Sequence, residues 1–141
     1  SVMTGQRQGD ILGLKWTQVD TLMGRIHFKQ SKTGKRIGVK ITKKVRRVLK
    51  LCERMAPAGD HVIRRRDGQR YTSDGFRAIW QRYQRRWMKA GHERFTYHDL
   101  RARAAGKCPT VQAAQQLLGH VSPGMTIRVY DRGEREAMPA I

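Results

Sequence analysis

The chain has 141 residues, with 30 lysines and arginines against 11 acidic residues and a formal net charge of +19 at pH 7. This length suits a single domain with its own core, and the charge points to a polyanion such as nucleic acid as the partner. No apolar stretch is long enough to span a membrane and no secretory leader is present, so we expect a soluble, cytoplasmic protein without a membrane partner.

The positive charge is unevenly distributed along the chain. Residues 25–66 hold 15 lysines and arginines against two acidic residues. A basic surface that is merely solvated, or one that binds a membrane, would also explain such a run. The basic residues alternate with core-forming ones instead of forming a tail, however, and this pattern favours nucleic-acid binding.

The first expected element is a short helix. Thr4 is a suitable N-cap for a helix that carries Arg7, Asp10, Ile11 and Leu14. Arg7 and Asp10 are three positions apart and would share one face. On spacing alone they would form a surface ion pair, which contributes little to stability.

A β-hairpin is expected next, after a polar turn at residues 17–20. Its tip, residues 31–35, contains Lys32 and a glycine that can adopt positive φ. A lysine in such a tip is usually only solubilising. We expect a third strand at residues 61–63. The apolar residues that alternate along the hairpin are Ile26, Phe28, Ile37, Val39 and Ile41.

Two helices follow the hairpin. The first should start after the Thr42 N-cap and stop before Pro57, with one apolar and one basic face. The second should have Ser73 as its N-cap and end near Gly91. Its aromatic stripe, interleaved with arginines, could stack on bases, but spacing of three and four residues favours the core. The stripe consists of Phe76, Ile79, Trp80, Tyr83 and Trp87.

The last third of the chain is predicted to be helical. One helix should begin at Thr96 or Tyr97, and the next should end at Gly119. Ser122 and Pro123 suit the N-cap and first position of a final short helix that places Tyr130 near its end.

His98 and Arg101 are three positions apart, so both can face one ligand from the same side of a helix. A guanidinium binds a phosphate or carboxylate through two parallel hydrogen bonds. A neighbouring imidazole can donate to the same anion or take up a proton near neutral pH. Tyr130 is a candidate nucleophile in the same region.

Five spaced motifs occur in one order along the chain. They are the segment from Thr4 to Leu12 that contains Arg7, the hairpin Lys32, His98-x-x-Arg101, Leu118-Gly119-His120, and Tyr130 ten residues after that histidine. Together they resemble the catalytic domain of the tyrosine recombinases, the phage integrase family. The resemblance covers residues 2–132 and implies an α+β fold, mostly helical with a small antiparallel β-sheet at one edge.

The resemblance also implies how a DNA phosphate is held. Arg7 and Arg101 would grip the scissile phosphate, and His120 would donate a hydrogen bond to it. Asp10 would be the acidic residue that helps hold the site in order. Two converging arginines can stabilise a phosphoryl-transfer transition state without a metal ion.

The remaining implied functions concern the nucleophile and its protons. Tyr130 would attack the phosphodiester and become linked to a 3′ phosphate, which conserves bond energy for rejoining. His98 would accept or relay the tyrosine proton. Lys32 would be the general acid for the departing 5′ oxygen.

No metal or other cofactor is expected. The acidic residues are few and scattered, whereas metal-dependent cleavage of phosphodiesters usually needs clustered carboxylates. Cys52 and Cys108 match no metal-ligand spacing and are expected to remain reduced inside the cell.

We expect residues 1–141 to form one catalytic domain, without the N-terminal DNA-binding clamp domain that recombinases of this family normally have. Residues 133–141 would be a short tail that is either disordered or packed on a neighbouring subunit. The sequence has Ala102 directly after Arg101, where many relatives have a histidine. Expected partners are double-stranded DNA and other recombinase subunits in a tetramer.

The expected function is site-specific DNA recombination through a covalent 3′-phosphotyrosine, for integration or excision of phage or other mobile DNA. Three alternatives stay open. One is a non-catalytic DNA-binding remnant, and another is a relaxing topoisomerase with the same chemistry. The third is an unrelated basic structural protein whose nucleic-acid binding depends on salt alone.

Overall fold

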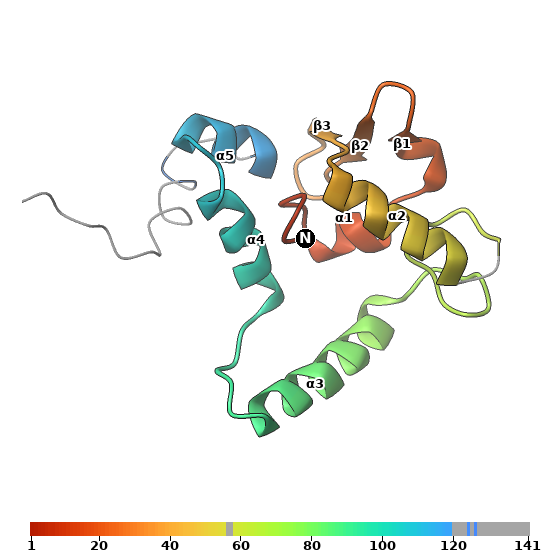
Figure 1. Cartoon of the computed structure of the whole chain (residues 1–141), viewed down its shortest axis with the longest axis vertical. Coiled ribbons are helices and arrows are strands. Elements are labelled where there is room, and N and C mark those ends of the chain that lie inside the picture. The colour runs from red at the N-terminus through yellow and green to blue at the C-terminus, as the bar shows by residue number, and fades with distance from the viewer. Residues whose placement is uncertain (56–57, 120–123, 125, 127–141) are drawn as a thin grey trace, which may run out of the picture.

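The computed structural model describes residues 1–55, 58–119, 124 and 126. These residues form a mostly helical chain with one small antiparallel sheet (Figure 1). The predicted fold class is therefore confirmed. The elements, in order, are α1 (Gln8–Leu12), a 3-10 helix η1 (Trp16–Gln18), β1 (Val19–Asp20), β2 (Arg25–Lys29), β3 (Arg36–Lys40), α2 (Lys43–Met55), α3 (Ser73–Lys89), α4 (Tyr97–Gly106) and α5 (Val111–Leu118).

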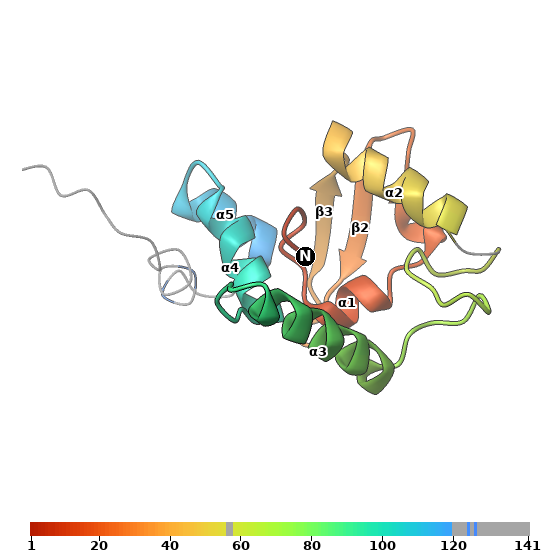
Figure 2. The ribbon, with the colours of Figure 1, turned by 60° about the horizontal axis from the view of Figure 1, so that its bottom comes forward.

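The sheet has the strand order β1-β2-β3, and its inner face makes the main core. Ile26 faces Val39 and Phe28 faces Ile37 across the central pair, as the period-two pattern predicted. Figure 2 shows β2 and β3 side by side with α1 and α2 beside them. Apolar side chains from these four elements and nearby loops form one cluster: Ile11, Leu14, Ile26, Phe28, Val39, Ile41, Val45, Leu49 and Val62.

The outer face of the sheet is exposed and basic. Arg25 lies opposite Lys40, and Lys29 lies opposite Arg36, in the antiparallel register. Like charges directly opposite each other destabilise a sheet. The outer face therefore contributes repulsion and not packing energy, and the stability of the sheet comes from its inner face.

Helices α4 and α5 pack on each other around small residues (Figure 1). Ala105, Ala114 and Leu118 have no exposed surface, and the two alanines let the helices approach closely. Thr96 and Thr110 cap the two helices by accepting backbone N–H groups, and Gly119 ends α5 at a φ of 65°. The predicted boundaries of both helices are confirmed.

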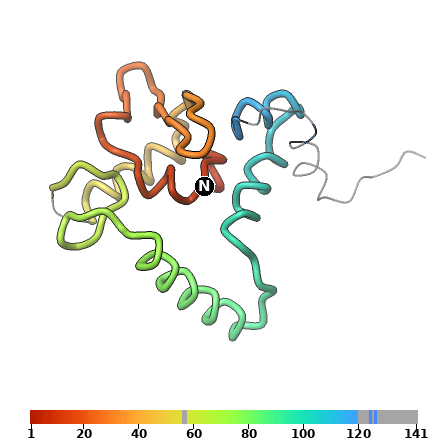
Figure 3. The backbone as a smooth tube through the Cα atoms, turned by 180° about the vertical axis from the view of Figure 1, so that it is seen from behind, coloured from red at the N-terminus to blue at the C-terminus, as the bar shows by residue number. Residues whose placement is uncertain are grey.

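Helix α3 is only partly covered by the described residues. Figure 3 shows it running from the loop after α2 to the segment before α4. Phe76 and Trp80 contact Phe95 and Tyr97 in an aromatic cluster. Tyr83 is 71% exposed, however, so the assignment of the whole stripe to the core is wrong.

Two predicted N-caps also differ from the structure. Helix α1 starts at Gln8 and not after Thr4. The backbone N–H groups of Thr4 and Gly5 donate to the Ser1 carbonyl in a turn, and Gly5 adopts a φ of 64°, which is not helical. The N-cap of α3 is Thr72, not Ser73.

The third strand is β1, not residues 61–63. A turn ending at Gly24, with φ 64°, folds β1 back onto β2, whereas His61 forms only an isolated bridge to Lys15. Apart from residues 124 and 126, the helix expected after Ser122 lies outside the described residues. Among those that are described, no helix is long and apolar enough to cross a membrane.

Candidate active site

Arg101 is the buried centre of the candidate site. It lies on α4 with 5% of its surface exposed. Its Nη1 donates to the Gly5 carbonyl at 2.5 Å, and its Nη2 donates to the Leu118 carbonyl at 2.6 Å. Leu118 is the last residue of α5, where carbonyls lack helical partners and the helix dipole favours a cation. The guanidinium thus joins the N-terminal turn to the end of α5.

Gly5 is required for this arrangement. Its φ is 64°, and an added Cβ would lie 3.0 Å from Leu117 Cγ. A residue with a side chain would be strained in this conformation and would push on α5. The turn therefore presents its carbonyl to Arg101 only because this position carries no side chain.

Arg7 lies next to this centre, at the N-cap of α1. Its Nη1 donates to Gln30 Oε1 at 3.0 Å. The pKa of Arg101 is lowered to about 10, mainly by burial and then by the nearby positive charge of Arg7, while Asp10 opposes both effects. Two guanidinium groups close enough to repel each other, one of them buried, form a site suited to an anion.

Asp10 is buried on α1 and fastens the hairpin turn. Its Oδ1 accepts hydrogen bonds from the Ser31 backbone nitrogen at 2.9 Å and from Ser31 Oγ at 2.8 Å. Its Oδ2 is buried without a hydrogen-bond partner among the described residues. Within that part of the chain Asp10 forms no ion pair with Arg7, so the surface pair suggested by spacing alone is wrong.

Lys32 and His98 are both exposed, Lys32 in the hairpin turn and His98 near the start of α4. Lys32 lies in the turn between β2 and β3, directly after Ser31. His98 lies in the first turn of α4, which is fixed by Thr96 and Asp99, each accepting a hydrogen bond from the other's backbone. Both side chains can therefore be reached by a large ligand, whereas Arg101 cannot move without disturbing the fold.

The family model described as "Phage integrase family" matches residues 1–136. The chain belongs to the phage integrase family. The predicted resemblance is thereby confirmed.

Two phage integrases are among the relatives. The chain is 32% identical to the integrase of Enterobacteria phage 434 and 30% identical to that of Escherichia phage lambda, in each case over 96% of this chain and 40% of the relative. It therefore spans well under half the length of these curated relatives. A crystal structure of a lambda integrase dimer bound to a COC′ core site has 29% identity and a TM-score of 0.75, covering 99% of this chain and 53% of that one.

The structure of this phage integrase family member brings together three of the seven predicted site residues: Arg7, Asp10 and Arg101. Lys32 follows a residue that Asp10 holds, and His98 is on the same helix as Arg101. The other two predicted residues, His120 and Tyr130, lie outside the described residues.

Sequence reasoning missed two buried glutamines beneath the arginines. Gln6 and Gln30 have no exposed surface, and Gln30 Nε2 donates to Gln6 Oε1 at 2.9 Å. A signal for Gln30 was present, because it continues the inward-facing alternation after Ile26 and Phe28. A polar residue at an inward position must find buried partners, which marks it as a structural or functional contact.

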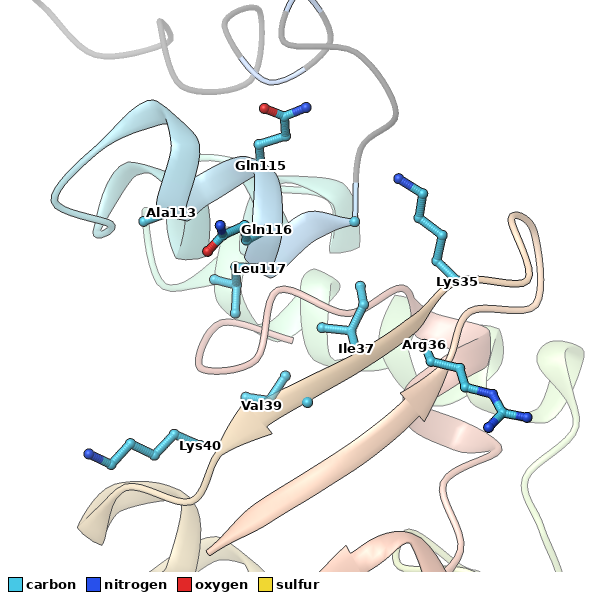
Figure 4. Close-up of a pocket in the computed structure, with 11 residues that line it drawn as sticks. Lys35, Arg36, Ile37, Val39, Lys40, Ala113, Gln115, Gln116 and Leu117 are labelled. Carbon is cyan, nitrogen blue, oxygen red and sulfur yellow. The ribbon is translucent and has the colours of Figure 1, made fainter.

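A groove of about 720 Å³ separates β3 from α5 (Figure 4). Lys35 and Lys40 extend away from its two ends, and Ile37 and Val39 point toward α5. Of the predicted catalytic residues that the structure describes, none lines the groove. One of its lining residues, Gly119, would bring an added Cβ within 2.8 Å of Gln30, so the groove adjoins the buried glutamines.

Proposed function

We propose that this chain is the catalytic domain, over residues 1–141, of a tyrosine-type site-specific DNA recombinase that works without a metal ion. The pair formed by Arg7 and Arg101 is the observation that carries the proposal. Arg101 is held by two backbone carbonyls and is repelled by Arg7, so an anion between them would relieve an existing electrostatic cost.

The anion in this proposal is the scissile phosphate of DNA. Phosphoryl transfer depends mainly on positioning and charge stabilisation, which fixed guanidinium groups supply. A guanidinium has five N–H donors, and the two backbone carbonyls that Arg101 contacts occupy only part of that capacity. Arg7 and Arg101 would bind the non-bridging oxygens, and His120 would add a hydrogen bond.

The covalent step in the proposal transfers the DNA strand to Tyr130. A bond forms between Tyr130 Oη and phosphorus as the bond from phosphorus to the 5′ oxygen breaks. The tyrosine proton passes to His98, and Lys32 protonates the leaving oxygen. Attack by a 5′ hydroxyl reverses the steps and rejoins the strand without an external energy source.

The substrate and assembly in the proposal follow the relatives. Lambda integrase structures include a dimer on a core site and a tetramer bound to a Holliday junction. For this chain we propose double-stranded DNA and further recombinase subunits as partners, with integration or excision of phage or other mobile DNA as the outcome. The reaction would take place in the cytoplasm, where the DNA is.

Covalent capture tests the proposal. The chain would be incubated in EDTA with duplexes labelled at the 5′ end and nicked a few nucleotides beyond candidate cleavage points. The short fragment that leaves with a free 5′ hydroxyl then diffuses away, and the labelled strand stays bonded to the protein. A labelled adduct that survives a denaturing gel is expected. Tyr130→Phe should abolish the adduct, while Tyr83→Phe, which changes an exposed tyrosine on α3, should leave it intact. DNA binding without any adduct would favour a non-catalytic remnant and contradict the proposal.

A further inference from the structure

The buried polar cluster beneath the two arginines centres on one side chain. Gln30 Oε1 accepts hydrogen bonds from Arg7 Nη1 at 3.0 Å and from Thr33 Oγ1 at 2.9 Å. Its Nε2 donates to Gln6 Oε1 and to the Leu118 carbonyl, each at 2.9 Å. A side-chain amide has two donors and two principal acceptor directions, so these four contacts use its full capacity.

The four contacts allow only one orientation of the Gln30 amide. A flipped amide would place its NH₂ group against the Arg7 Nη1 donor, and its oxygen against the Leu118 carbonyl. Both pairs would repel each other while buried, which is costly. The network therefore aims the Gln30 oxygen at Arg7.

The same network joins the two arginines. The Leu118 carbonyl accepts hydrogen bonds from both Gln30 Nε2 and Arg101 Nη2. A continuous path thus runs from Arg7 through Gln30 and this carbonyl to Arg101. Since the two guanidinium groups repel each other, Arg7 would move away without an acceptor to hold it.

The hairpin turn is fastened to this network on both sides of Lys32. Ser31 is bound by Asp10, and Thr33 is bound by Gln30. Because Ser31 and Thr33 are both held, the backbone of Lys32 between them can occupy only a narrow range of positions.

We infer that Gln30 is a positioning residue, which holds Arg7 against the repulsion of Arg101 and fixes the turn that carries Lys32. This inference rests on the proposed function, in which Arg7 contacts the scissile phosphate. Gln30 itself is buried and does not reach the DNA in this scheme. It acts through the group that its oxygen orients.

The test compares Gln30→Met with Gln6→Met. Both glutamines are fully buried and belong to one network, but of the two only the Gln30 side chain accepts a hydrogen bond from the Arg7 side chain. The rate of adduct formation would be measured on two duplexes that contain the captured cleavage site. One has a normal scissile phosphate, and the other has a methylphosphonate there, which removes the negative charge. Gln30→Met should slow the phosphate reaction on the order of 100-fold, as a misplaced positioning group does. The loss should be much smaller on the methylphosphonate, where an arginine has less charge to stabilise.

Gln6→Met supplies the comparison for simple destabilisation. It should slow adduct formation on both substrates by the same factor, because the Gln30 oxygen that accepts from Arg7 stays in place. An equal loss on both substrates for Gln30→Met would overturn the inference. So would a Gln6→Met profile identical to that of Gln30→Met.

A second measurement does not depend on DNA chemistry. The ¹⁵N NMR signals of the Arg7 guanidinium, assigned with Arg7→Lys, should show restricted rotation in the unaltered chain and in Gln6→Met. In Gln30→Met they should collapse to an averaged signal. A freely averaged Arg7 guanidinium in the unaltered folded chain would overturn the inference even if Gln30→Met failed to fold. Absence of an adduct with a restricted Arg7 would instead count against the proposed function alone.

Discussion

Gly119 is the position where one added methyl group should cost the most. Its φ is 65°, and an added Cβ would lie 2.5 Å from Ile37 Cδ1 and 2.8 Å from Gln30 Oε1. The left-handed conformation costs an L-residue roughly 1–2 kcal/mol. Displacing packed neighbours costs a further ~1–3 kcal/mol. Gly119→Ala should therefore lower the free energy of unfolding by about 2–5 kcal/mol.

Gly24→Ala is the matched control. Gly24 has nearly the same φ, 64°, but nothing lies within 4 Å of an added Cβ. It should cost only the conformational part, roughly 1–2 kcal/mol. Urea unfolding followed by circular dichroism would measure both variants. If Gly119→Ala costs no more than Gly24→Ala, the close packing of Gly119 against Ile37 and Gln30 is refuted.

Three further predictions concern the charges. Arg101→Lys should lower the free energy of unfolding by about 1.5–3 kcal/mol, because one ammonium group cannot reach both backbone carbonyls; an unchanged urea midpoint would contradict this. Lys40→Glu, opposite Arg25, should raise that free energy by roughly 0.2–1 kcal/mol, since it turns a repelling cross-strand pair into an attracting one. High salt should erase the gain, and a gain that persists there would exclude an electrostatic cause. Sulfate at about 100 times its dissociation constant should stabilise the chain by roughly 2.7 kcal/mol over sodium chloride of equal ionic strength, and Arg7→Gln should remove that difference if the arginine pair binds the anion.

Local features of the fold were predictable from the sequence. The hairpin follows from two alternating runs around a glycine turn, and the end of α5 follows from Gly119. The start of α2 follows from Thr42, whose hydroxyl accepts the Val45 N–H. In each case neighbouring residues satisfy the backbone, so short sequence windows contain the necessary information.

Features that depend on distant contacts were not predictable in the same way. The stripe on α3 has core-like spacing, but spacing does not show whether another element covers it, and Tyr83 is largely exposed. The two-residue strand β1 is too short to have a periodic pattern. It forms because the turn before Gly24 brings it back to β2.

The candidate site shows the same difference between features set by local sequence and features set by distant contacts. The family motifs identified Arg7 and Arg101 by residue type and order, but not by environment. Arg101 bonds to Gly5, 96 positions away, and Gln6 bonds to Leu117, 111 positions away. Burial and repulsion between the arginines depend on these long-range contacts, so only the folded chain reveals them.

Mass-spectrometric mapping of the captured protein–DNA adduct tests the central claim most directly. After nuclease and protease digestion of a reaction run in EDTA, the account predicts a nucleotide linked through its 3′ phosphate to the peptide that contains Tyr130. A nucleotide on another residue would contradict it. DNA cleavage that requires a divalent metal and leaves no nucleotide on the protein would contradict it as well.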